Sequence, residues 1–429
     1  MSDSPIRLGF TGLGHRGASL VKRCLSMDDV TVSAICDVQE RRLEVVDEQI
    51  QAADRPSPDR YADHHTMVEE AAIDGVVIAT SWRYHIPFAI AAMEAGVWPG
   101  LDVGPASSLE ECWQLVHTAE ATGQHCMLLE NGCFGRTCMG ILSMARAGLF
   151  GRLVHGECGY CHDLRGRLNS ISGTSRAETA LELDGERYFR GVQHAKRNGD
   201  LYPTHGVGPI AQCFDINRGN RFTSLSSRAS DPAGLADWAE HHLPADHPSQ
   251  DIDWTHGDIV TTVITCASGQ TLTVVHDVSL PRPNNSKRRI LRGTRGMWQE
   301  ELDAVYIDEM SPDHEWESLD TYLGEHEHTL WEAYQADGPR GGHGGSDYLV
   351  LRAFVQSIAQ DVRPPIDVYD AAAWMAISPL SEASIEAGGD AVTFPDFTNG
   401  QWLVNEPHFG LMDEAGPQQL DFGTLLETA

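Results

Sequence analysis

The sequence predicts an α/β domain with a parallel sheet, followed by an α+β domain with an open, mainly antiparallel sheet and helices on one face. Strands and helices alternate up to about residue 131, a glycine-rich turn follows the first strand, and later segments are rich in Val, Ile and Thr. We therefore expect two domains, 1–131 and 132–400, and a loosely packed C-terminal tail over 401–429.

A glycine fingerprint lies between the first predicted strand and the first predicted helix. The apolar stretch Ile6–Thr11 runs into Gly-Leu-Gly-His-Arg-Gly, and a helical stretch follows. Gly12 permits the tight turn, Gly14 lets the backbone approach a pyrophosphate, and Gly17 lets the helix pack on the strand. The helix N-terminus offers free N–H groups to the phosphates. This arrangement is typical of a Rossmann dinucleotide-binding domain.

Asp37 indicates that the dinucleotide is NAD. It ends a second predicted strand over 32–36, 20 residues beyond Gly17. A carboxylate at this place accepts hydrogen bonds from the adenosine ribose and repels a 2′-phosphate. A strand–helix turn that binds no ligand is the alternative. Further cofactor contacts are expected from His15, Arg16, Trp82, His85, Asp102, Val103 and Asn131.

The rest of the first domain continues the alternation. The continuous apolar run Val76–Thr80 is typical of a strand that is buried on both faces. Helical spacing occurs over 86–95 and 109–122, and Ser108 is a cap residue for the second helix. A further strand is expected over 126–130. Ligands of such sheets bind beyond the carboxyl ends of the strands.

The pattern changes in the second domain. Segments 154–160, 259–265 and 271–278 have the alternation or the Val, Ile and Thr content of strands in an antiparallel sheet. Turn-rich linkers separate them. Helices are expected over 136–147, 348–360 and 368–387.

Composition and charge exclude several classes of partner. The formal net charge is −31, from 31 basic and 62 acidic residues, which disfavours nucleic acids and anionic membranes. No segment approaches about 18 uninterrupted apolar residues, the length of a membrane-spanning helix. The first five residues lack the basic and apolar signal of a secretory leader, so a cytoplasmic location is expected.

No metal site is expected. Cys158 and Cys161 form an isolated CxxC in a strand-like segment, whereas a zinc or redox site needs further ligands or a helix start. The other cysteines are scattered, several in apolar runs, which suits reduced core residues. His343 lies between two glycine pairs, and this segment is expected to be a flexible loop that approaches a ligand.

The chain resembles the Gfo/Idh/MocA family, whose members mostly oxidise sugars and inositols. Dehydrogenases of that family carry a Lys after the fifth strand that helps to take the hydroxyl proton, and an Asp-x-Gly-x-His motif later. Val103 stands at the position of the Lys, and Leu201 and Pro203 stand at the positions of the Asp and the Gly. The resemblance therefore implies that the ordinary dehydrogenase site is broken in this chain.

Five dispersed motifs are similar to glycoside hydrolase family 109, whose members are NAD-dependent glycosidases best known for removing terminal N-acetylgalactosamine. These motifs are Leu129–Asn131, Cys158–Arg165, Asn198–Gly206, Ile216–Gly219 and Val368–Ala372. The resemblance implies that NAD takes a hydride from C3, that a base removes the C2 proton, and that the aglycone is eliminated. Water then adds and the hydride returns, so the tightly bound cofactor is regenerated in each turnover. The expected substrate is a terminal N-acetylgalactosaminide or a related glycoside.

The same resemblance assigns roles to four catalytic residues. His205 transfers the proton of the C3 hydroxyl, and Tyr202 assists. Tyr160 takes the C2 proton or contacts the sugar, and a phenol needs neighbouring positive charge to act as a base. Glu130 protonates the leaving oxygen and activates water. The expected substrate-binding residues are Tyr160, Arg190, Tyr202, Pro203, Thr204 and His205.

Other interpretations stay open at this point. Tyr160 suits packing in a strand, Glu130 a helix cap, His205 a buried hydrogen-bonded histidine, and Arg190 a surface ion pair. Asn284 stands where the family has a Tyr that touches the sugar, which leaves the sugar open. The alternative functions are a sugar or inositol dehydrogenase that releases NADH and a non-catalytic NAD-binding sensor. The family also implies a homo-oligomer that forms through the open sheet.

Overall fold

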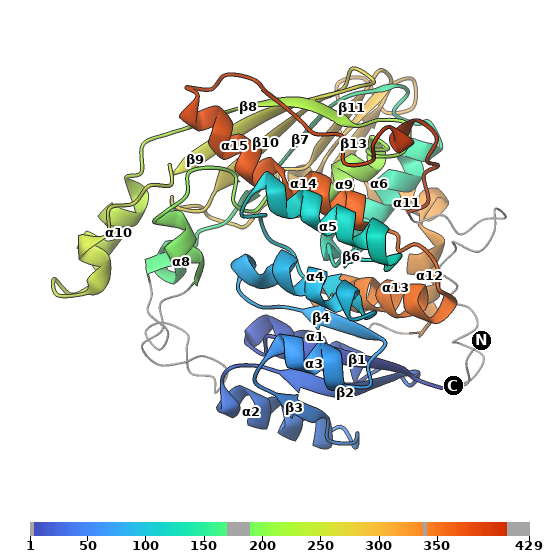
Figure 1. The fold of residues 1–429 in the computed structure, drawn as a ribbon. Helices are drawn as coiled ribbons and strands as arrows, with labels where there is room; N and C mark the ends of the chain where they lie inside the picture. The colour runs from blue at the N-terminus through green and yellow to red at the C-terminus, as the bar shows by residue number, and fades with distance from the viewer. Residues whose placement is uncertain (1–3, 170–188, 338–340, 410–429) are drawn as a thin grey trace.

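Two sheets organise the computed structural model, which describes residues 4–169, 189–337 and 341–409 (Figure 1). All pairings in the first sheet are parallel. Its strands are, in spatial order, β3 (Asp59–Tyr61), β2 (Val30–Cys36), β1 (Ile6–Thr11), β4 (Gly75–Ile78), β5 (Trp98–Leu101) and β6 (Met127–Leu128). This strand order is that of a Rossmann domain, and it confirms the predicted fold class of the N-terminal part.

The helices of this first layer follow the predicted alternation. They are α1 (His15–Cys24), α2 (Glu40–Gln51), α3 (His64–Glu70), α4 (His85–Glu94) and α5 (Leu109–Thr122). Helix α5 has the predicted bounds because its ends carry strong local signals. The Ser108 hydroxyl accepts the N–H of Glu111 at 3.2 Å, and Gly123 ends the helix with φ 69°.

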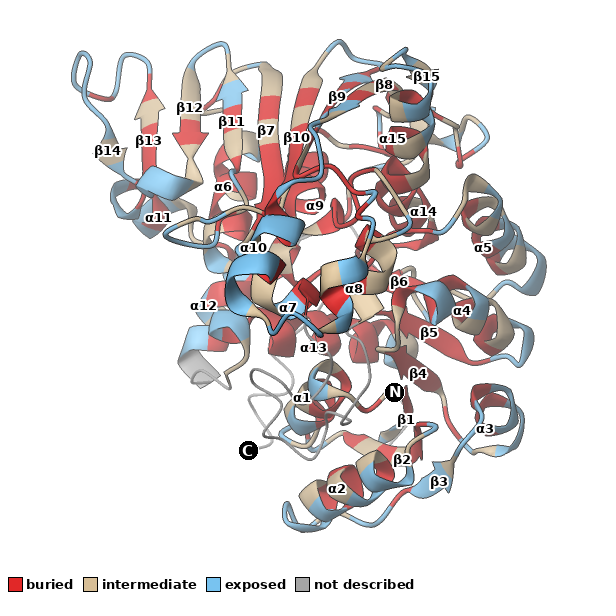
Figure 2. Ribbon diagram, turned by 90° about the vertical axis from the view of Figure 1, so that its left-hand side faces the viewer, coloured by how far each residue is buried: buried red, intermediate tan, exposed pale blue. Residues whose placement is uncertain are grey.

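The second sheet is mixed but mainly antiparallel, as predicted. Its strands are, in spatial order, β14 (Glu317–Ser318), β13 (Ala304–Ile307), β12 (Gly296–Gln299), β11 (Ile290–Gly293), β7 (Leu153–Cys161), β10 (Thr271–Asp277), β9 (Ile259–Cys266), β8 (Phe222–Ala229) and β15 (Val392–Thr393). Strands β7 and β10 are parallel neighbours. Side chains along β9 alternate between buried and exposed, so one face of the sheet packs on the protein and the other is open (Figure 2).

Helix α13 (Ser346–Gln360) comes late in the chain but packs on the first sheet, where Figure 1 shows it in orange. A Cβ on Gly75 in β4 would lie 2.6 Å from Ile358, and a Cβ on Gly100 in β5 would lie 3.0 Å from Phe354. Glycine at both strand positions therefore allows the close approach of the helix. A helix that lies far beyond residue 131 in the sequence therefore packs on the first sheet.

The helix predicted over 368–387 is two helices, α14 (Val368–Met375) and α15 (Ile377–Glu386). Pro379 explains the break, because proline has no N–H to donate to the carbonyl four residues earlier. That carbonyl belongs to Met375, and it accepts the N–H of Ala106 at 3.3 Å instead. The proline thus frees a backbone acceptor that joins the C-terminal helices to the segment before α5.

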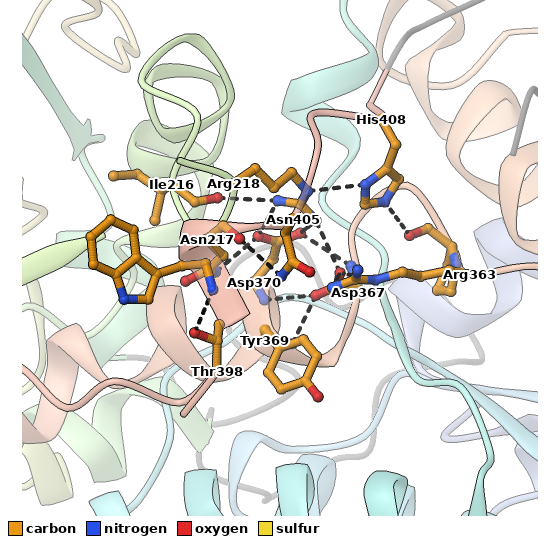
Figure 3. A network of polar contacts seen from close by, with 12 residues as sticks. Ile216, Asn217, Arg218, Arg363, Asp367, Tyr369, Asp370, Thr398, Asn405 and His408 are labelled. Atoms are coloured by element: carbon orange, nitrogen blue, oxygen red, sulfur yellow. Dashed lines mark hydrogen bonds and ion pairs between the residues drawn. The ribbon is translucent and has the colours of Figure 1, made fainter. Parts of the chain in front are cut away.

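A buried polar network joins the C-terminal segment to the turn before β8 (Figure 3). Arg218 donates to both oxygens of Asp370, at 2.8 and 2.7 Å, and to Asp367 at 3.0 Å. The Nδ1 atom of His408 accepts the Nε–H of Arg218 at 3.0 Å. The motifs at 216–219 and 368–372 therefore bind each other and serve the fold.

The same network holds His408 and Phe409 within the segment predicted as a loose tail, whereas Leu403 and Val404 of that segment are exposed. His408 also donates from Nε2 to the carbonyl of Pro364 at 3.0 Å. Phe409 is buried, and its carbonyl accepts Arg146 at 2.6 Å. The remainder of the predicted tail, 410–429, lies outside the described residues. Across the described ranges, no helix has both the length and the apolar character needed to cross a membrane.

Candidate active site

The glycine fingerprint forms a cradle at the carboxyl end of β1. Gly12 has φ 85°, and a Cβ there would lie 2.7 Å from the carbonyl oxygen of Ala79. A Cβ on Gly17 would lie 1.8 Å from the carbonyl oxygen of Gly12, so α1 can pack here only without a side chain. Beyond its chain neighbours, no described atom lies within 4 Å of a Cβ on Gly14, at the N-terminus of α1. The cradle fits the pyrophosphate of a dinucleotide.

Asp37 lies beside this cradle, where the ribose contact is predicted. Its carboxylate accepts the backbone N–H of Leu13 at 2.8 Å and that of Gln39 at 2.9 Å. Arg42 lies 3.5 Å from Oδ2. These contacts fix a buried carboxylate at the end of β2, which suits recognition of ribose hydroxyls.

A polar network joins α13 to the cradle. Arg16 lies 3.3 Å from Asp102 and 2.9 Å from Asp347, and Asn131 donates to Asp347 at 2.7 Å. His343, which lies in the loop predicted to approach a ligand, is bonded to the second oxygen of Asp347 at 2.7 Å. Three predicted cofactor residues thus meet around Asp347, which the sequence analysis missed. The only signal was its place at the start of a helix after the glycine pairs.

Glu130, which is fully buried, and His205, which is partly exposed, form a close pair. Glu130 follows β6 and accepts the N–H of Gly132, at 2.9 Å, in the short helix η2 (Asn131–Phe134). His205 lies in the first turn of α9 (Thr204–Cys213), and its Nδ1 is 2.6 Å from Glu130 Oε1. The Glu130 carboxylate is therefore both a helix cap and the partner of His205.

Burial and charge set the protonation of this pair. Burial acts to raise the pKa of Glu130, but the charge and hydrogen bond of His205 outweigh it and hold that pKa below its usual value. Burial lowers the pKa of His205, and Glu130 offsets only part of this effect. The stable form is a Glu130 carboxylate that accepts the Nδ1–H of a neutral His205. The His205 Nε2 is then a basic nitrogen that can take a proton near neutral pH.

Stacked aromatic rings connect this pair to the dinucleotide domain. Tyr202 stacks on Trp82, which follows β4, with ring centroids 5.4 Å apart. Tyr160 in β7 lies 4.5 Å from Tyr202 and 5.9 Å from His205 between ring centroids. Arg190, in α8 (Phe189–His194), places its guanidinium 4.3 Å from the Tyr202 ring and 4.9 Å from the Trp82 ring. These five predicted residues converge on one place.

Lys287 also belongs to this group, although the sequence analysis missed it. Its Nζ lies 4.0 Å from the centre of the Tyr160 ring and 3.3 Å from Nε2 of His162. Burial, with Arg289 adding to the effect, lowers the pKa of Lys287 to about 7. A cavity of about 280 Å³ opens here, and its lining includes Lys287, His162 and Asn284. No sequence pattern marks this lysine beyond its place in the turn after Asn284.

Burial corrects the roles predicted for several residues. Thr204 is fully buried, so its hydroxyl cannot meet a sugar that enters from solvent. Glu130 is fully buried too, and cannot reach a leaving oxygen directly. His85 is buried with Nε2 bonded to the Thr80 carbonyl at 3.0 Å, so it supports the turn after β4. Val103 is buried and apolar, whereas His15 is exposed at the start of α1.

Two family models match successive parts of the chain. A model described as "Oxidoreductase family, NAD-binding Rossmann fold" matches residues 6–129, and "Glycosyl hydrolase 109, C-terminal domain" matches residues 134–404. The chain is 43% identical over 421 residues to an alpha-N-acetylgalactosaminidase of Tannerella forsythia, an alignment that covers 96% of this chain and 90% of the relative. It is 40% identical to a glycosyl hydrolase family 109 protein of Parabacteroides distasonis, with coverage of 95% and 90%.

A solved structure supports the fold. An oxidoreductase domain protein from Kribbella flavida superposes with a TM-score of 0.68 over 92% of this chain and 100% of its own. The sequence identity is 16%, so this likeness concerns architecture alone.

Proposed function

The chain belongs to glycosyl hydrolase family 109 and is an NAD-dependent glycosidase, and we propose that it cleaves a terminal N-acetylgalactosaminide, or a related glycoside, by transient oxidation at C3. The observation that carries this mechanism is the Glu130–His205 pair beside Tyr160, next to the dinucleotide domain. The relative from Tannerella forsythia supports the substrate class. The buried Val103 disfavours a dehydrogenase that relies on a lysine at that position.

The residues divide the proton transfers between them. His205 Nε2 takes the proton of the C3 hydroxyl, and Glu130 acts through it as a positioning residue that holds Nδ1–H. Burial raises the pKa of Tyr202, so it remains a neutral phenol that can donate a hydrogen bond to the sugar. Tyr160 takes the C2 proton. When bound, NAD supplies a hydride acceptor that returns the hydride to C3 and so stays in place.

Elimination of the aglycone and addition of water follow the oxidation at C3. Loss of the C2 proton to Tyr160 makes the C1–C2 double bond as the C1–O bond breaks, and the aglycone oxygen takes up a proton from solvent. Water then adds its hydroxyl to C1 and releases its other proton to solvent, while Tyr160 gives a proton back to C2. His205 finally gives its proton back to the C3 oxygen as the ketone is reduced, so the net reaction is hydrolysis.

Turnover of a panel of nitrophenyl glycosides in deuterated water tests this proposal. We expect hydrolysis with deuterium incorporated at C2 of the released sugar, because Tyr160 exchanges its proton with solvent before hydration. We expect no accumulation of NADH absorbance. Stoichiometric NADH with an intact glycosidic bond would instead identify a dehydrogenase, and bound NAD with neither reaction would identify a sensor.

We also propose that Lys287 supplies the positive charge that Tyr160 needs to act as a base. Its Nζ lies over the Tyr160 ring, while the neutral His162 can accept a hydrogen bond from it, because burial lowers the pKa of His162 to about 3. Arg289 and Arg190 act against the charge of Lys287, and Glu130 and Glu300 favour it. In this position the ammonium group would stabilise the negative charge of a Tyr160 that acts as a base.

The pH profile of kcat/KM tests the role of Lys287. Because its pKa is about 7, the ammonium form is lost as pH rises through that value, and activity should fall along an alkaline limb there. Lys287→Met should lower the plateau by about 10- to 100-fold and remove the limb. Lys287→Arg, which stays charged, should restore part of the plateau without a limb near pH 7. An unchanged plateau and limb in Lys287→Met would contradict the assignment.

A further inference from the structure

Three buried histidines lie next to the active site and have no part in the proposed reaction. His194 ends α8, His256 precedes β9, and His276 lies in β10, directly opposite Tyr160 of β7. Each is at most 1% exposed. One ring nitrogen from each lies within 4.8 Å of the other two.

Each imidazole has an acceptor on its outer side. His194 donates from Nδ1 to the carbonyl of Arg190 at 2.7 Å, and His256 donates from Nε2 to the carbonyl of Gly199 at 2.8 Å. Nδ1 of His276 lies 3.6 Å from Oδ1 of Asp200, near this acceptor but beyond hydrogen-bond distance. Outer carbonyl and carboxylate partners of this kind fix the tautomers of histidines that bind metals.

The inner nitrogens then face one another with lone pairs. Nε2 of His194 and Nε2 of His276 are 3.4 Å apart, and Nδ1 of His256 is buried with no hydrogen-bond partner. A proton between the first two nitrogens would make only a long hydrogen bond. A shared cation satisfies all three inner nitrogens.

We propose that His194, His256 and His276 bind one divalent transition metal ion of the zinc class. Imidazole nitrogens bind zinc at about 2.0–2.1 Å, and a tetrahedral ion with such bonds separates its ligand nitrogens by about 3.3–3.4 Å. The 3.4 Å between His194 and His276 matches this separation. The ligands are far apart in the sequence, so no metal-binding motif marks them.

The ion would have a structural role next to Arg190 and Tyr160, two of the side chains proposed to bind the sugar. It would join α8, which carries Arg190, to the strand beside Tyr160. His256 connects the ion through Gly199 to the segment that leads to Tyr202. The three ligands are buried, so the ion positions these side chains and takes no part in the reaction itself.

Metal analysis of the full-length protein, purified without a histidine tag, tests the proposal. We expect about one equivalent of a zinc-class ion per chain by mass spectrometry. Removal by a strong chelator should lower Tm by several degrees, and zinc should restore it. Cobalt in the same site should give the visible absorption of a tetrahedral nitrogen-bound ion.

Two variants separate this site from adventitious binding. His256→Ala should lose the stoichiometric ion, whereas His241→Ala, on the exposed helix α10 (Gly234–His242), should keep it. If His256→Ala does not fold, the chelation and cobalt measurements on the wild-type chain decide. Wild-type protein that holds less than about a tenth of an equivalent, and whose Tm does not respond to zinc, cobalt, nickel, copper or manganese, would overturn the proposal. Equal metal loss in both variants would also overturn it.

Discussion

Replacing His205 with alanine is expected to abolish glycoside turnover while NAD stays bound. The substitution removes the basic Nε2 that takes the C3 hydroxyl proton, and loss of such a group costs typically about 10²–10⁴-fold in rate. The cofactor cradle is built from the turn between β1 and α1, whereas His205 lies in α9. Steady-state turnover and the NAD content of the purified variant measure the two effects separately. Retained activity would remove His205 from the mechanism.

Glu130→Gln is the matched variant for this prediction. An amide keeps the size of the side chain, and its oxygen can still accept the N–H of Gly132 and the Nδ1–H of His205, but it removes the negative charge that stabilises His205 once Nε2 has taken the proton. We expect a fall in kcat of similar size with NAD binding intact. In the wild type, the acid limb of the pH profile should lie below about pH 6.5, because burial lowers the pKa of His205 below that ordinary value. A wild-type acid limb well above pH 7 would conflict with this protonation scheme.

The sequence predicted those parts of the molecule that depend on neighbouring residues. The fingerprint of Gly12, Gly14 and Gly17 predicts a tight turn, and Ser108 predicts the start of α5. The structure has these features because backbone conformation and helix capping are set within a few residues. The break at Pro379 could have been predicted in the same way.

The parts that the sequence did not reveal depend on distant partners. Asp347 binds Arg16, which lies 331 residues earlier in the sequence. No local pattern indicates that α13 packs on the first sheet. Lys287 gains its low pKa only from burial among charged neighbours that the fold supplies. The side-chain roles of Glu130 and Thr204 changed for a related reason. Motif position placed both residues near the site, but burial is a property of the folded chain.

The motif around Arg218 shows that similarity within a family can mark stability as well as catalysis. Arg218 is buried between Asp367 and Asp370, and Arg363 pairs with Asp367 on the other side (Figure 3). Two cations thus balance two carboxylates. Removing Arg218 would leave Asp370 buried without its cation, and an uncompensated buried charge is far more costly than a lost surface pair.

Arg218→Met is therefore expected to lower the free energy of unfolding by about 3–5 kcal/mol, the cost of breaking a buried ion pair from one side. Arg7→Met is the control, because Arg7 binds both oxygens of Asp74 with a similar geometry but on the surface, and should cost about 0–1 kcal/mol. Adding Asp370→Asn to Arg218→Met should recover part of the loss, since it removes the stranded charge. Urea unfolding midpoints and Tm measure all three. Equal costs for the two arginine variants would show that the buried network contributes no more than an exposed pair.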